Sequence, residues 1–372
     1  MLYGILQLPI VRNFTIEPAA YEISDYIDRI GAQINAFTSK EITCYYTKST
    51  SEHLEKTLDV LSDIFFNSVF DKEEMDKERG VIIEEINMSI DSPEDYCLDL
   101  LAKGYHGDRG LGRPILGSVK NVRRFDKDEI NAYMDKYYTA DNVVVSIAGN
   151  VDENKAFDLV EKLFSERFTR LISKRQVETA SESPKQLFKS KKTEQTHISF
   201  AFPGLAVTSP KSDALAIANI VFGGGMSSRL FQKVREEMGL CYTVYSYLSQ
   251  YKDQGVIEIY AGVNNGQRDN AVKAIIGEFD KLKNNGITEA EFSRGKEQIK
   301  SAFIMGREST SSQMLLFGKN LLIKGMQFDF DERMANLNSV TLGEVNAVIK
   351  ECFNKEKMAS ATLGKARKPL FF

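Results

Sequence analysis

Two stretches of the chain follow one pattern: EINAYMDKYYTADNVVVSIAG at Glu129–Gly149 and EVNAVIKECFNKEKMASATLG at Glu344–Gly364. They align without a gap, and each predicts a helix, a short turn and an apolar strand that ends in glycine. Only four of the 21 aligned positions are identical, so the repeat depends on this pattern and on its similar place in each half of the chain. The sequence therefore predicts two related domains.

The predicted strands and helices come in blocks and do not alternate strictly. This order favours the α+β class, with two related domains that each hold a mixed or antiparallel sheet and helices packed on one side. β-Branched and aromatic residues predict strands in both halves of the chain. The predicted strands are 34–39, 43–48 and 142–148 in the first half, and 197–202, 242–249, 256–261 and 358–363 in the second.

The length of 372 residues exceeds what one hydrophobic core usually serves, which also predicts two domains. A polar, irregular stretch that ends in Ser-Glu-Ser-Pro is typical of a linker. We therefore expect an N-terminal domain at 1–168, a linker at 169–185 and a C-terminal domain at 186–372.

The composition excludes several classes of protein. Hydrophobic residues make up 42% and charged residues 27%, as in a folded globular chain. The 48 Lys and Arg residues nearly balance the 52 Asp and Glu residues, so nothing suggests a nucleic-acid partner. No apolar run approaches the roughly 20 residues of a membrane-spanning helix.

The cysteines bear on the compartment. Four cysteines are widely spaced along the chain and form no Cys-x-x-Cys pair, which argues against a disulfide framework and a thiolate zinc site. We expect a reducing environment and a cytoplasmic protein.

One predicted helix carries a pair of carboxylates. Glu78 and Glu85 are seven residues apart, and at about 100° per residue both project from the same face. In such a pair, one carboxylate can ligate a metal ion and the other can orient the ligands around it. The alternative is an ordinary solvated face in an acidic segment.

Several motifs extend these observations: INAFTSKEITCYYTK at 34–48, DKERGVIIEEINM at 76–88, GRPILG at 112–117 and FGGGMSSRLFQKVREEMGLCYTVYSY at 222–247. They resemble the M16 metallopeptidase family, the insulinase, pitrilysin and mitochondrial-processing-peptidase group, and in particular its short bacterial members. The resemblance implies pairs of related α+β domains that close around an unfolded peptide. It also implies a homodimer, or a heterodimer with a homologous chain.

The resemblance assigns residues to peptide binding. Asn35, Ala36 and Phe37 match the edge strand that pairs with substrate backbone, a role suited to unpaired main-chain groups. Arg235 and Tyr242 match the pair that contacts the substrate carbonyl and the charge developing on its oxygen. Taken without the resemblance, Arg235 is a surface cation on a helix and Tyr242 a packing residue on a strand.

The resemblance also implies zinc, with Glu85 as the third ligand and Glu78 as the acidic residue that supports the site. The family's His-x-x-Glu-His motif, which supplies two imidazoles and a catalytic Glu, would fall at or just before Met1. The sequence has three histidines, and none has a second His at that spacing. One carboxylate holds zinc weakly, so we expect a chain that is inactive alone.

Two interpretations of this pattern remain open. One is a peptidase sequence shortened before the zinc motif, which the joint presence of Glu78, Glu85, Arg235 and Tyr242 favours. The other is a non-catalytic subunit that pairs with an active homologue and supplies part of the peptide chamber. Substrate identity does not follow from the sequence under either interpretation.

Overall fold

The structure is a computed structural model of the chain and describes residues 20–165, 168 and 184–365. The predicted linker lies outside these residues, except for 184 and 185. The described chain forms two compact units, each built from separate parts of the sequence. As far as they are described, the first contains Met1–Met88, Pro114–Gln176 and Arg307–Phe328, and the second contains Ser89–Arg113, Val177–Gly306 and Asp329–Phe372.

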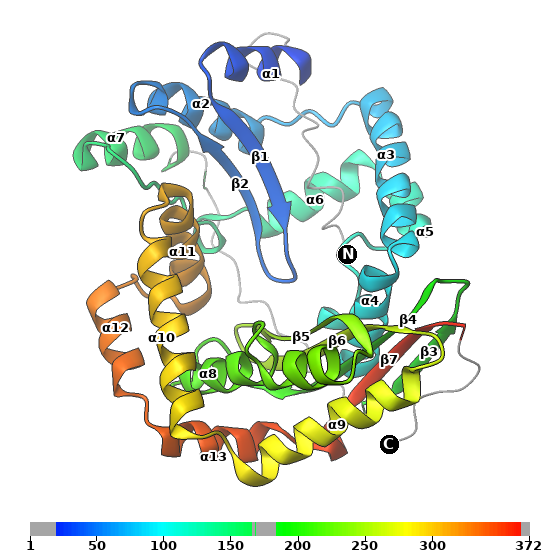
Figure 1. Ribbon diagram of the computed structural model, residues 1–372. Helices are drawn as coiled ribbons and strands as arrows, with labels where there is room; N and C mark the ends of the chain where they lie inside the picture. The colour runs from blue at the N-terminus through cyan, green and yellow to red at the C-terminus, as the bar shows by residue number, and fades with distance from the viewer. Residues whose placement is uncertain (1–19, 166–167, 169–183, 366–372) are drawn as a thin grey trace. The chain divides into compact units, whose positions relative to one another are not determined.

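The first unit is mainly helical around one β-hairpin (Figure 1). Its elements are α1 (Ala20–Arg29), β1 (Gln33–Thr38), β2 (Thr43–Lys48), η2 (Ser51–His53), α2 (Leu54–Phe66), α3 (Lys72–Asp91), α5 (Val119–Arg124), α6 (Lys127–Tyr137), η4 (Ala140–Asn142), α7 (Glu153–Phe164) and α11 (Thr310–Lys324). Helix α3 begins after Asp71, whose Oδ1 accepts hydrogen bonds from the N–H groups of Glu73 and Glu74. Apolar faces of α1 and α2 pack together around Ile27 and Val60.

The second unit contains a five-stranded sheet in the order β3-β7-β4-β6-β5 (Figure 1). Its elements are α4 (Pro93–His106), η3 (Gly110–Gly112), β3 (Gln186–Ser190), β4 (Gln195–Gly204), α8 (Ser212–Gly223), η6 (Phe231–Glu237), β5 (Cys241–Gln250), β6 (Gly255–Asn264), α9 (Arg268–Asn285), α10 (Glu289–Gly306), α12 (Phe330–Ser339), α13 (Leu342–Cys352), η7 (Lys355–Lys357) and β7 (Ala359–Gly364). Strands β3 and β7 are parallel, and the other neighbours are antiparallel. The predicted α+β class with mixed and antiparallel sheets is confirmed.

The two faces of this sheet meet different helices. Alternate residues of β4, Ile198, Phe200 and Phe202, enter one large core with α8, α9 and α13. Ala201 on the opposite face packs instead against Cys97 and other residues of α4. The helices from the second half of the sequence therefore cover one face, and a helix from the first half covers the other.

The internal repeat is visible in the backbone. Helices α6 and α13 begin and end at aligned positions, and so do the short η4 and η7 turns. Gly149 and Gly364, which end the two copies, have φ values of 147° and 152°. Both copies thus follow the same path from helix to final glycine.

The strand predicted at 142–148 does not appear among the strands that the structure describes. Asn142 ends the η4 turn, and 143–148 belong to no ladder among the described strands. The aligned strand β7 has a neighbouring strand on each side, β3 and β4. Residues 143–148 have no such neighbours among the described strands. Instead, Ser146 Oγ donates a hydrogen bond to the carbonyl of Met314 in α11, at 2.8 Å. No helix in the described part of the chain is both long and apolar enough to cross a membrane.

Candidate functional site

The β1–β2 hairpin determines which backbone groups face away from the ladder. Ser39 N–H donates to Ile42 O across the turn, which makes this the hydrogen-bonded pair that closes the hairpin. Pairs alternate along an antiparallel ladder, so Ala36, opposite Tyr45, is in a non-hydrogen-bonded pair. The N–H and C=O of Ala36 therefore point to the outer edge of β1, as do those of Ile34 and Thr38.

The predicted substrate-binding residues lie at the middle of this edge. Asn35 and Phe37 project from the exposed face of β1, with Phe37 38% exposed and its ring 6.3 Å from that of Tyr46. The side chain of Asn35 occupies part of the edge itself, since its Oδ1 accepts a hydrogen bond from Ala36 N–H at 2.7 Å.

The two carboxylates on α3 influence each other through their charges. Partial burial, followed by the negative charges of Glu85 and Glu74, raises the pKa of Glu78 above its usual value. Both Glu78 and Glu85 are half-buried, and no described residue donates a hydrogen bond to either or pairs with it as a cation. A pair of like charges without a counter-ion is unfavourable, and a bound cation would relieve it.

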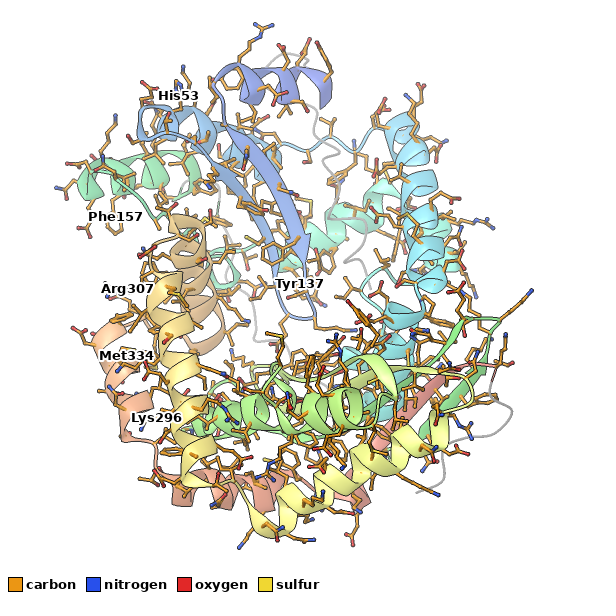
Figure 2. The ribbon with its side chains drawn as sticks, viewed as in Figure 1. His53, Tyr137, Phe157, Lys296, Arg307 and Met334 are labelled. Atoms are coloured by element: carbon orange, nitrogen blue, oxygen red, sulfur yellow. The ribbon has the colours of Figure 1, made fainter. Side chains whose placement is uncertain are left out.

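The described residues do not complete a zinc site around this pair. Zinc in proteins takes three or four protein ligands, usually including His or Cys. No group of three or more His, Cys, Asp or Glu side chains able to hold a metal ion occurs in the part of the chain that the structure describes. His53 lies where η2 passes into α2 (Figure 2), and its Nε2 is 3.7 Å from a carboxylate oxygen of Glu52.

Arg235 and Tyr242 meet in the second unit. Arg235 belongs to η6, which is a π-helix: Met238 N–H donates to Lys233 O, five residues back. Gly239, at φ 60°, turns the chain from this helix into β5, where Tyr242 is 75% exposed. The Cζ atom of Arg235 lies 4.7 Å from the ring centre of Tyr242.

A second aromatic ring, Phe231, belongs to the same group. The Cζ atom of Arg235 lies 4.6 Å from its ring centre, four residues back along η6. The sequence analysis did not identify Phe231, although the spacing of four residues places two side chains on neighbouring positions of a helix.

A partly buried ion pair fixes the segment that enters η6. Arg229 donates from Nε and an Nη atom to both carboxylate oxygens of Glu291 in α10, each at 2.7 Å. Glu291 also accepts from Thr288 N–H at 2.8 Å. Burial raises the pKa of Glu291, but these hydrogen bonds, with Arg229 first, lower the pKa to about 2. The start of η6 is thereby held to α10.

Each predicted site residue thus belongs to one of three local groups. The edge residues are on β1 and the carboxylate pair on α3, both in the first unit, and Arg235 with Tyr242 is in the second.

Known proteins share this fold along nearly the whole chain. A Helicobacter pylori protease matches with a TM-score of 0.85 and 23% identity, covering 97% of this chain and 88% of that one. A structure titled peptidase M16 inactive domain, from Pseudomonas fluorescens, matches with a TM-score of 0.86 and 19% identity over 99% and 90% of the two chains. At these identities the likeness concerns the fold, which is that of M16 peptidase proteins.

Sequence comparison is more specific. The family model described as "Insulinase (Peptidase family M16)" matches residues 14–119, and "Peptidase M16 inactive domain" matches 124–299. "Uncharacterized zinc protease YmxG" of Bacillus subtilis is 42% identical over 346 residues, covering 92% of this chain and 83% of that protein. An uncharacterized zinc protease of Streptomyces coelicolor is 37% identical over 93% of this chain and 77% of its own length. The chain belongs to peptidase family M16, as its motifs predicted.

Proposed function

We propose that this M16-family protein binds extended, unfolded peptides by strand addition to the outer edge of β1. The observation that carries the proposal is the ladder register, which turns the N–H and C=O of Ala36 away from β2. Main-chain groups at a strand edge bind any extended peptide whatever its side chains. The two flanking outward-facing residues, Ile34 and Thr38, extend the edge to the length of a short bound strand.

Arg235 and Tyr242 also bind peptide in this proposal, through groups of the second unit. A guanidinium carries donors in a fixed plane, and a phenol carries a hydroxyl, so both are suited to a carbonyl oxygen. Tyr242 is largely exposed and Arg235 is 32% exposed at its side chain, which leaves both accessible to a ligand within their own unit. They would bind the peptide carbonyl whose oxygen gains negative charge when the bond is attacked.

Zinc is the metal that the family and the names of its relatives imply, and Glu85 with Glu78 is the place for it in this sequence. The donor set in the described residues falls short of three ligands. We therefore assign no catalytic step to the metal here, and we propose that the purified chain does not hydrolyse peptides by itself.

The second candidate is a non-catalytic subunit that pairs with an active M16 peptidase. The incomplete donor set around Glu85 favours it, because a subunit that only binds peptide needs no zinc ligands. A homodimer or a heterodimer with such a homologue is the assembly that this role requires. The four free cysteines support a reducing compartment, the cytoplasm, for either role.

Two measurements on purified protein test the proposal. Binding of a fluorescent, unfolded peptide is measured by anisotropy, and cleavage of a quenched version of the same peptide is followed with and without added zinc. We expect saturable binding without turnover, and zinc well below one ion per chain. Zinc near one per chain together with turnover would overturn the proposed inactivity, and failure to bind would overturn peptide binding.

The two candidate roles differ when a homologue carrying His-x-x-Glu-His is added. A stable complex with higher peptidase activity than the homologue alone supports the subunit role. If the two proteins elute separately and the activity does not change, the subunit role is refuted.

A further inference from the structure

The guanidinium of Arg235 is held by aromatic rings and by little else. Its Cζ lies 4.6 Å from the ring centre of Phe231 and 4.7 Å from that of Tyr242. Its closest ionic partner is Glu236, with 3.6 Å between Nε and the carboxylate oxygen, which is beyond hydrogen-bond distance. Within the described part of the chain, the guanidinium N–H groups of Arg235 donate no hydrogen bond.

This arrangement leaves the donors of Arg235 available. A ring covers the flat face of a guanidinium, and the N–H bonds lie in the guanidinium plane. Ring contact therefore restricts how the group can turn without using any of its donors. A side chain of four rotatable bonds that is fixed in this way loses less entropy when it binds a carbonyl.

Phe231 and Tyr242 differ in how firmly each ring can restrain the guanidinium of Arg235. Tyr242 is 75% exposed, so neighbouring side chains restrain its ring weakly. Phe231 is half-buried, and it stands on the same π-helix between Leu230 and Val234, which are both fully buried. The segment is also held at Arg229 by the ion pair with Glu291.

Phe231 is not needed to fill the core of the unit. Leu230 and Val234 belong to the large hydrophobic cluster of the second unit, whereas Phe231 belongs neither to that cluster nor to the residues packed against it. Its ring therefore has a partner in Arg235 that core packing does not account for.

We propose that Phe231 is a positioning residue whose ring orients the guanidinium of Arg235 toward the carbonyl of a bound peptide. The inference rests on the proposed function and adds a third residue to the Arg235–Tyr242 group. Phe231 itself does not touch the peptide and acts through Arg235.

The test uses Phe231→Leu, which removes the ring, and Phe231→Tyr, which keeps it. A matched control is Phe303→Leu, because Phe303 makes a similar contact, 5.7 Å from Cζ of Arg333, outside the Arg235 group. Peptide affinity is measured by anisotropy for the full chain, and the Nε–Hε resonance of Arg235 is followed by NMR. Thermal unfolding midpoints establish that each variant is folded.

We expect Phe231→Leu to weaken peptide binding about two- to fivefold, the range of one exposed cation–π contact, and to move the Arg235 resonance. Phe231→Tyr and Phe303→Leu should bind like the unchanged chain. In a chain that already carries Arg235→Met, Phe231→Leu should cause no further loss, since the ring then has nothing to orient.

Three results would overturn the inference. They are unchanged affinity in folded Phe231→Leu, an unmoved Arg235 resonance in that variant, and an equal loss with Arg235→Met present. Absence of peptide binding in the unchanged chain would refute the proposed function, and with it the role of Phe231 in peptide binding. The Arg235 resonance would still report separately whether the Phe231 ring holds the guanidinium.

Discussion

Replacing Ala36 by proline removes one backbone donor from the outer edge of β1 and leaves the hairpin ladder intact. Ala36 is in a non-hydrogen-bonded pair with Tyr45, so its N–H makes no bond to β2. Proline is tolerated at strand positions whose N–H faces away from the ladder. The variant should therefore fold while losing a donor that strand addition would use.

The expected loss follows from the number of peptide hydrogen bonds affected. The missing N–H removes one bond, and the proline ring obstructs the adjacent one at the same edge. At about 1 kcal/mol for each, the loss is about 2 kcal/mol, or about thirtyfold in Kd. The internal bond from Ala36 N–H to Asn35 Oδ1 is lost as well, which reduces the net effect.

The assay is anisotropy of a fluorescent unfolded peptide, with Thr47→Pro as the matched control. Thr47 pairs with Ile34 at another non-hydrogen-bonded position, so its N–H faces the outer edge of β2. We expect Thr47→Pro to bind normally and Ala36→Pro to bind weakly. Equal affinity of the two folded variants, or a larger loss in Thr47→Pro, would refute binding at the β1 edge.

Three further predictions concern the ion pair Arg229–Glu291, residues 143–148 and Asn35. Glu291→Gln should lower the free energy of unfolding in urea by about 1–2 kcal/mol at pH 7. Because the pKa of Glu291 is lowered to about 2, the unchanged chain should lose its extra stability over the variant as pH falls below 5. A stability difference that does not depend on pH would contradict this prediction. Hydrogen exchange should be slow at 359–364 and faster at 144–149, where no described strand pairs, and equal protection would indicate an additional strand. Asn35→Ala should bind peptide about threefold more tightly, since the competing bond is gone; weaker binding would mean that the amide contacts the peptide.

Local patterns in the sequence predicted most of the elements. The hairpin at β1 and β2, the strands β4, β5, β6 and β7 of the second unit, and the helix that carries Glu78 and Glu85 all appear at or near the predicted residues. Strand β3 (Gln186–Ser190) was not predicted. These features depend on side chains that are close in sequence, where periodicity, capping residues and β-branched residues are informative.

Features that depend on distant parts of the chain were not predicted. Apolar residues at 142–148 are as strand-like as those of β7, but a ladder requires neighbours that no local pattern supplies. The packing of α4 on the sheet of the second unit was missed for the same reason. The sequence analysis also missed Phe231, whose ring lies against Arg235 on the same π-helix.

The interleaving of the two units along the chain has a practical consequence for producing fragments of the protein. A fragment that starts at residue 184 would omit α4 and leave the sheet face around Ala201 and Ala361 in water. It would also retain α11, whose packing partner at Ser146 would be gone. Such a half-molecule should aggregate unless residues 89–113 are supplied, for instance by coexpression.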